Sequence, residues 1–119
     1  MTVQDNIKIA GVEYRGEHDG MVSAAVTPDR LASASAALVQ HGLRLSLLFA
    51  TDDRTADRSY GIHVIFAADD EHRWIMLSAA VPQDVPNYPS VTALVPAAHW
   101  YERYAMDMFG VVAAGHPDP

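Results

Sequence analysis

Histidine and carboxylate side chains are the groups in this sequence that could hold a metal ion or transfer a proton. The six histidines are dispersed along the chain, and neither H-x-x-x-H nor H-E-x-x-H occurs. His99 and Glu102 are three residues apart, a spacing that di-iron proteins use on a helix, but such a site needs further carboxylates from other helices. We therefore predict no metal site, and we expect the histidines to lie in loops and on the surface.

Other catalytic groups are scarce. Cysteine is absent, which excludes disulfides, thiolate nucleophiles and cysteine-ligated zinc, iron–sulfur or nickel centres within this chain. The serines occur without a G-x-S-x-G elbow, and no glycine-rich phosphate loop is present. We predict no catalytic residue, no cofactor-binding residue and no cofactor in this chain. A small metal-dependent enzyme that uses His99 and Glu102 remains an alternative.

Length and charge limit the classes of partner. The chain has 119 residues and a formal charge of −7, and its basic residues are scattered singly. Because phosphate neutralisation needs clustered cations, we expect no nucleic-acid partner. One core fits this length, so we treat residues 1–119 as a single domain. No apolar run approaches the roughly 20 residues that span a bilayer, and a signal peptide's basic and apolar regions are missing, so we expect neither insertion nor secretion.

The first half of the chain predicts a hairpin and a helix. Residues 12–26 fit a β-hairpin whose loop holds the two glycines at 16 and 20. Thr27-Pro28-Asp29 is typical of a helix start, and Gly42 of a helix stop after His41. This helix places Leu31, Ala34 and Leu38 on one face. The first eleven residues carry no clear pattern.

Three strands are predicted next, because apolar and polar residues alternate over 43–49, 60–66 and 73–76. The polar connections at 51–58 and 69–71 are short, which favours an antiparallel meander. Prolines crowd residues 82–96, so we expect an ordered loop that crosses the domain.

A last helix is predicted over 97–109, before Gly110 and a short extended tail to residue 119. At about 100° per residue, one broad side of this helix, which we expect to pack on the sheet, carries Ala97, Trp100, Tyr101, Tyr104, Ala105 and Met108. The other side carries His99, Glu102, Arg103 and Met106, with Asp107 at its edge.

The segment from Tyr88-Pro-Ser-Val-Thr to Gly110, followed by Gly115-His-Pro-Asp118, resembles the signature of the 30 kDa subunit family of respiratory complex I. Tyr-Pro-Ser-Val-Thr and Val-Pro-Ala-Ala before Trp100, and Leu-Ser-Leu-Leu-Phe-Ala-Thr-Asp-Asp-Arg at 45–54, make it more similar to the N-terminal domain of the large subunit of formate hydrogenlyase and related group 4 membrane-bound nickel–iron hydrogenases. The resemblance covers about residues 20–118 and is strongest from 88 onward. The positions that match the family motif are Glu102, Arg103, Asp107, Gly110, His116, Pro117 and Asp118.

The resemblance implies a two-layer α+β fold, in which a mixed, mostly antiparallel sheet has helices packed on one face and contains a parallel pairing. It implies a non-catalytic scaffold domain that docks against a hydrogenase-like catalytic subunit or module and a neighbouring iron–sulfur subunit. The parent complex would carry the nickel–iron and iron–sulfur clusters and would hold this domain in the cytoplasm, peripheral to the inner membrane. We expect docking to use His99, Glu102, Arg103, Met106 and Asp107, with His116 beside them.

Two departures from the family pattern leave alternatives open. Tyr104 stands where the family has a second acid, and the family continues past His-Pro-Asp whereas this sequence stops at Pro119, so we expect a longer parent chain. A stand-alone C subunit of respiratory NADH:quinone oxidoreductase is the first alternative, and an unrelated binding module is the second. Glu102 and Arg103 could also act inside the domain, by holding the proline-rich loop to the helix.

Overall fold

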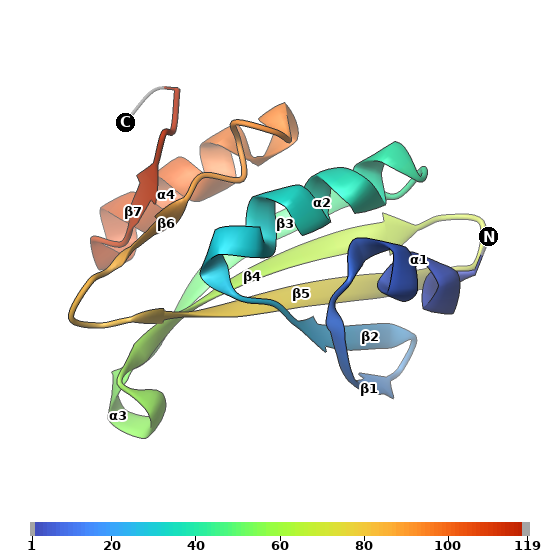
Figure 1. The fold of residues 1–119 in the computed structure, drawn as a ribbon, viewed down its shortest axis with the longest axis horizontal. Coiled ribbons are helices and arrows are strands. Elements are labelled where there is room, and N and C mark those ends of the chain that lie inside the picture. The colour runs from blue at the N-terminus through green and yellow to red at the C-terminus, as the bar shows by residue number, and fades with distance from the viewer. Residues whose placement is uncertain (1, 118–119) are drawn as a thin grey trace.

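A five-stranded sheet forms one layer of the structure, and helices form the other (Figure 1). The computed structural model describes residues 2–117, so Asp118 of the family motif lies outside the described residues. In spatial order the strands are β1 (Glu13–His18), β2 (Met21–Ala25), β5 (Arg73–Pro82), β4 (Ser59–Ala68) and β3 (Arg44–Asp53). β2 pairs with β5 in parallel and the other neighbours are antiparallel. The α+β fold and the parallel pairing implied by the resemblance are thus confirmed.

The chain begins with a helix that the sequence pattern did not indicate, α1 (Val3–Ala10). Thr2 and Asp5 form a capping box: the Thr2 hydroxyl accepts from the Asp5 amide at 3.1 Å, and the Asp5 carboxylate accepts from the Thr2 amide at 2.9 Å. Gly11 ends the helix in the left-handed region, with φ at 69°.

The predicted hairpin is present, but its turn is tighter than expected. β1 and β2 are joined at Asp19 and Gly20, both of which have positive φ. Gly16 lies inside β1, where the register shifts, and not in the loop that we predicted. The next helix begins with a short 3₁₀ turn, η1 (Pro28–Arg30), and continues as α2 (Leu31–Gln40). Thr27 makes no capping bond through its side chain.

The antiparallel meander of β3, β4 and β5 is confirmed, with strands that are longer than predicted. Alternate side chains point toward the helices and are buried, including Leu48, Ile62, Val64, Phe66, Ile75, Leu77 and Val81. Leu31, Ala34 and Leu38 of α2 meet them in a single core. The connection at 51–58 is only in part a turn, because β3 extends to Asp53 and a short helix, α3 (Arg54–Asp57), follows.

The proline-rich segment crosses the helical layer and pairs with the tail. β6 (Asn87–Pro89) runs parallel to β7 (Val112–Ala114), which places the two segments side by side (Figure 1). Between them lie the 3₁₀ turn η2 (Pro96–Ala98) and the last helix, α4 (His99–Phe109). α4 ends at Gly110 in the left-handed region, as predicted.

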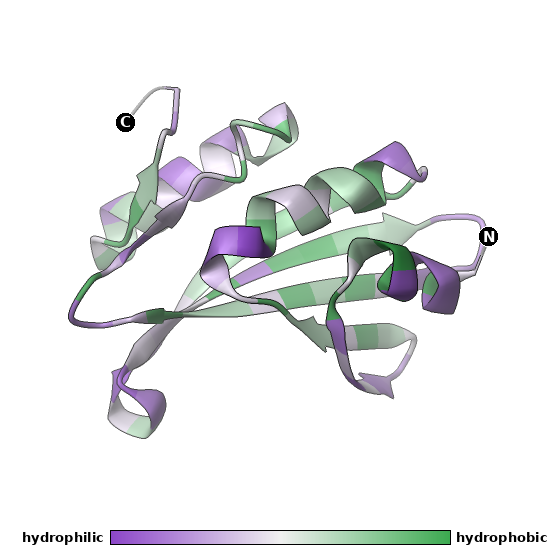
Figure 2. Cartoon of the chain, in the orientation of Figure 1, coloured by the Kyte–Doolittle hydropathy of each residue, from purple (hydrophilic) through white to green (hydrophobic). Residues whose placement is uncertain are grey.

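The helices leave the second face of the sheet uncovered, because the core residues of α2, η2 and α4 all meet the same set of inward-facing strand residues. Figure 2 shows that β4 and β5 are mostly apolar along their length, whereas the connection between them is hydrophilic. Within residues 2–117, no helix is long and apolar enough to cross a membrane.

Candidate functional site

The last helix turns its aromatic side toward solvent, which reverses the predicted orientation. Trp100 is 73% exposed, Tyr104 66% and Met108 56%, and Tyr101 beside them is 37% exposed. These four residues form a continuous strip one helical turn apart, which we call the α4 outer stripe. The prediction that this side packs on the sheet was wrong for all four, and correct only for Ala105, which is 4% exposed.

The side of α4 that packs is centred on Glu102. Its carboxylate is completely buried, and Ala98 and Ala105 flank it with 0% and 4% exposure. The small alanines let the helix approach its neighbours closely. Farther along, Phe109 meets Tyr60 of β4 with their ring centroids 6.4 Å apart. The placement of Glu102 on a solvent-facing side was therefore wrong.

Glu102 is tolerated in the core because five hydrogen-bond donors surround its carboxylate. Three hydroxyls donate to it: Tyr88 at 2.7 Å, Ser90 at 2.6 Å and Thr92 at 2.6 Å. The backbone amides of Val91 and Thr92 add bonds of 2.8 and 3.1 Å. A buried carboxylate is stable when its oxygens are paired in this way. All five donors come from residues 88–92, so Glu102 ties the proline-rich segment to α4, and the internal alternative is confirmed for this residue.

Tyr88 is the largest donor of this cluster and is almost fully buried. Burial raises the pKa of the Tyr88 hydroxyl far above its ordinary value, and the Glu102 charge and hydrogen bond raise it further. Tyr88 therefore stays protonated and remains a donor. Sequence reasoning missed Tyr88, Ser90 and Thr92; their signal is a run of hydroxyl residues ten to fourteen positions before a helical glutamate.

The other residues that we predicted for docking do not form one exposed face. His116 is 5% exposed, and its ring centroid lies 4.9 Å from that of His99. Nε2 of His116 is 3.3 Å from the backbone carbonyl oxygen of His99, so the tail packs on the start of α4. Arg103, Met106 and His99 are half-buried, and Met106 packs against the core. Asp107 is exposed.

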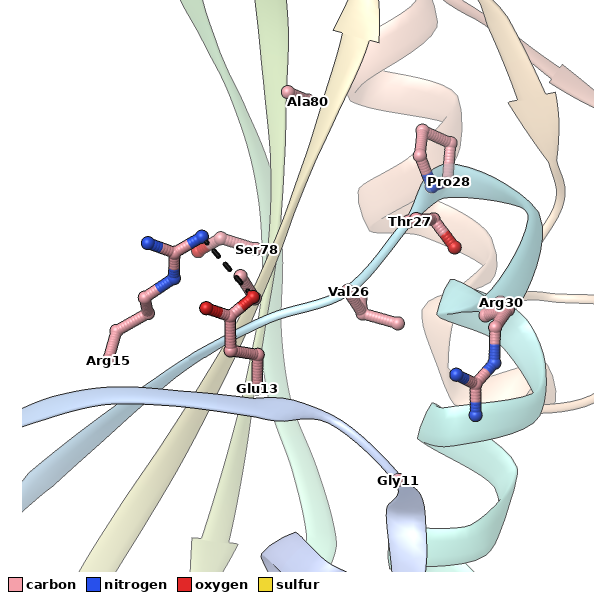
Figure 3. A pocket seen from close by; sticks show the side chains of 10 residues that line it. Gly11, Glu13, Arg15, Val26, Thr27, Pro28, Arg30, Ser78 and Ala80 are labelled. Carbon is pink, nitrogen blue, oxygen red and sulfur yellow. Dashed lines mark hydrogen bonds and ion pairs between the residues drawn. The ribbon is translucent and has the colours of Figure 1, made fainter.

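A pocket of about 470 Å³ lies between β1, β5, the end of β2 and η1 (Figure 3). Arg15 points across it and pairs with Glu13 at 3.5 Å, while Arg30 lies at its edge near Gly11. Glu13 offsets the Arg15 charge, and no buried polar side chain points into the pocket from the residues that line it. Within residues 2–117, no group of three histidine, aspartate or glutamate side chains is placed to hold a metal ion.

The comparisons with known proteins agree with the fold. Hydrogenase-4 component G of Escherichia coli (strain K12) is 39% identical over 80 residues, which are 66% of this chain and 14% of that protein. Formate hydrogenlyase subunit 5 of the same strain is 39% identical over 75 residues, 62% of this chain and 13% of that protein. The C subunit of NADH-quinone oxidoreductase of Halorhodospira halophila (strain DSM 244 / SL1) is 36% identical over 67 residues, 56% of this chain and 27% of that protein. The chain thus aligns with less than a third of the length of each of these relatives.

Two solved structures share the fold. The trypsin-resistant fragment (1-134) of Nqo5 superposes with a TM-score of 0.80 at 22% identity, covering 98% of this chain and 96% of that one. A chain of the membrane-bound sulfane sulfur reductase, an archaeal respiratory membrane complex, gives a TM-score of 0.78 at 21% identity, covering 96% of this chain and 69% of that one. The family described as respiratory-chain NADH dehydrogenase, 30 Kd subunit, matches residues 24–119. Most of the sequence lies within that match, and the chain belongs to this family.

Proposed function

We propose that this chain is a docking domain of a membrane-associated, energy-converting oxidoreductase complex of the hydrogenase type. In this proposal it contributes no redox centre, and it holds a hydrogenase-like catalytic subunit or module beside a neighbouring iron–sulfur subunit. The family match and the relatives from hydrogenase-4 and formate hydrogenlyase support the setting. The domain would lie on the cytoplasmic side, peripheral to the inner membrane.

The α4 outer stripe is the observation that carries the docking proposal. Tryptophan and tyrosine bury large areas with little loss of side-chain freedom, and they dominate the energy of protein interfaces. Trp100 and Tyr104 face solvent although the same helix buries a carboxylate. In the isolated domain the apolar parts of these side chains are in contact with water, which is unfavourable, and a partner would cover them. Asp107 and Arg103 would lie at the polar margin of this interface, where charge contributes specificity.

A role in an NADH dehydrogenase is the second candidate. The C subunit of NADH-quinone oxidoreductase of Salinispora arenicola (strain CNS-205) is 56% identical over 45 residues, 38% of this chain and 18% of that protein. The same docking surface would then meet the catalytic subunit of an NADH dehydrogenase. Identification of the co-purifying catalytic subunit by mass spectrometry distinguishes the two candidates.

The test is affinity purification of the tagged chain from membranes of its source organism. Trp100 and Tyr104 are changed to alanine together, and the retained fraction of the catalytic subunit is measured. We expect docking to weaken about 30-fold or more, which is about 2 kcal/mol. Both side chains are exposed, so the midpoint of thermal unfolding of the free domain should change little.

Ile9→Ala is the matched control, because Ile9 is 45% exposed on α1 and lies outside the α4 outer stripe. This variant should retain the catalytic subunit as the unchanged chain does. Equal retention by the double variant and the control would count against docking through α4. Purification of the chain without any oxidoreductase subunit would contradict the proposed function itself.

A further inference from the structure

The sheet face that no helix covers is apolar at its centre. Side chains that point away from the helices alternate with the core residues along β2 to β5, and the larger ones are Met21, Leu47, Phe49, Ile65, Trp74 and Met76. We call these residues the open sheet face. Trp74 is 40% exposed and Leu47 38% exposed. The uncovered face of an antiparallel sheet is ordinarily polar, so this composition is unusual for a surface in contact with water.

No charged residue lies in the middle of this face. The neighbouring outward positions of β2, β4 and β5 are serine, alanine, glycine or histidine. Charged residues appear at the margin, and two ion pairs occur there: Arg15 with Glu13 at 3.5 Å, and Arg44 with Asp69 at 3.1 Å. Nε2 of His18 and the Asp19 carboxylate also lie there, 3.2 Å apart. An uncharged centre with a polar margin is the usual composition of a protein–protein interface.

Four polar side chains on this face form a continuous chain of hydrogen bonds. The Thr51 hydroxyl donates to Asp53 at 2.9 Å, so it must accept at its other contact, from Nε2 of His63 at 2.9 Å. In neutral His63 the Nδ1 atom is then the acceptor, and the Ser78 hydroxyl donates to it at 2.8 Å. Burial lowers the pKa of His63 and favours this neutral form. Thr51, His63 and Ser78 can therefore be covered with the bonds among them made, whereas the charged Asp53 carboxylate lies at the end of β3, at the margin of the face.

A hollow of about 410 Å³ marks one end of the face. Met21, Leu47, Ile65 and Trp74 line it, together with His18, Asp19 and Ser46 at its border. Farther along β3 and β4, Phe49 stacks on His63, with the ring centroids 4.9 Å apart and the planes at 26°. The face thus combines an apolar hollow, in which a partner's side chain can be seated, with a stacked pair of rings, Phe49 and His63.

We propose that the open sheet face is a second interface, which packs against an apolar, uncharged surface of another protein subunit. The proposal rests on the docking function argued above and adds a surface on the other side of the sheet from α4. Charge identifies the kind of partner. A nucleic acid or an anionic membrane surface needs clustered cations, which the centre of this face lacks. A second copy is disfavoured because each chain carries a formal charge of −7.

Hydroxyl-radical footprinting read by mass spectrometry tests this surface. Oxidation rates are compared between the free domain and the complex purified through a tag on this chain. The two tryptophans serve as separate reporters, because Trp74 lies on the open sheet face and Trp100 on the α4 outer stripe. We expect the rates at Trp74 and Met21 to fall about fivefold or more on assembly, whereas exposed His41 keeps its rate.

A charge placed on the face provides a second test. Leu47→Lys puts an ammonium group in the hollow at a position exposed enough to spare the core, and retention of partner subunits should fall about tenfold or more. Ile9→Lys, at a similarly exposed aliphatic position on α1, should retain them. Circular dichroism of each free variant checks that the fold is intact.

The outcomes separate the two proposals. Protection of Trp100 with unchanged oxidation of Trp74 would overturn the second interface and leave docking through α4 intact. Protection of Trp74 in the free domain as its concentration rises would assign the face to a second copy and overturn the proposed partner. Recovery of the chain without oxidoreductase subunits would overturn both proposals.

Discussion

Glu102 shows how a charged side chain can organise a small domain from within. Its carboxylate lies 0% exposed and receives five hydrogen bonds from one five-residue segment. Two of those bonds come from backbone amides, so Glu102 fixes the path of the chain as well as the side chains around it. Glu102 thereby ties to α4 the segment that contains the end of β6, which in turn pairs with the tail through β7.

Replacement of Glu102 by glutamine tests that role. The amide keeps the shape of the side chain but loses the charge. Its NH₂ group cannot accept hydrogen bonds, yet it would face donors that bind a carboxylate oxygen in the unchanged domain. We expect a loss of about 3 kcal/mol or more in the free energy of unfolding, measured by urea denaturation of the free domain. Asp107→Asn on the same helix is the control, and it should change stability by no more than about 0.5 kcal/mol because Asp107 is exposed. Similar urea midpoints for the two variants would refute the bracing role.

The lowered pKa of His63 predicts how the stability of the domain depends on pH. Burial lowers its pKa in the folded domain, although the nearby Asp53 carboxylate opposes the shift. The unfolded chain therefore binds this proton more readily, and stability should be lost as the pH falls below about 6.5, the ordinary histidine value. Between pH 7.5 and 5.5 the unchanged domain should lose more stability than the His63→Gln variant. An NMR titration that places the pKa of His63 at or above 6.5 would contradict this prediction.

At the scale of elements, the sequence predicted where helices and strands lie better than how they face. The last helix was placed correctly because hydrophobic period and Gly110 are local signals. Its predicted orientation about its own axis was wrong, because the hydrophobic pattern assigns Trp100 to the core and Glu102 to the surface. The hydrogen-bond donors that allow Glu102 to be buried lie ten to fourteen residues upstream of it, in a segment without a periodic pattern. The parallel pairing of β6 and β7 was missed for the same reason, since it joins distant segments.

The strand β4 contains a position where only glycine fits the observed arrangement. A Cβ atom on Gly61 would overlap Oγ1 of Thr51, and it would stand 2.5 Å from Nε2 of His63 and 2.7 Å from Oδ2 of Asp53. Gly61→Ala must push the hydrogen-bonded chain apart, and we expect it to cost about 1–3 kcal/mol in the free energy of unfolding. In a Thr51→Ala background the same substitution should cost less. An equal cost in both backgrounds would trace the effect to the strand backbone.

At the scale of the whole molecule, the two proposed interfaces belong to different layers. The α4 outer stripe lies on the helical layer, and the open sheet face lies on the opposite side of the sheet. A domain only 21 Å across its shortest dimension can then contact two subunits at once. Such bridging accounts for an apolar surface on each layer of so small a domain, and it requires no chemistry from the domain itself.

The last prediction concerns metal content. Glu102 cannot serve the site considered with His99, because both its carboxylate oxygens accept bonds inside the core. On the open sheet face, His63 and Asp53 both contact Thr51 and would provide two ligands where structural zinc takes four. After dialysis against a chelator, the domain should hold less than about 0.1 equivalents of nickel, iron or zinc by elemental analysis. One equivalent of metal that survives chelation, and is lost in the His63→Gln variant, would show that the open sheet face is a metal site and would end its assignment as an interface.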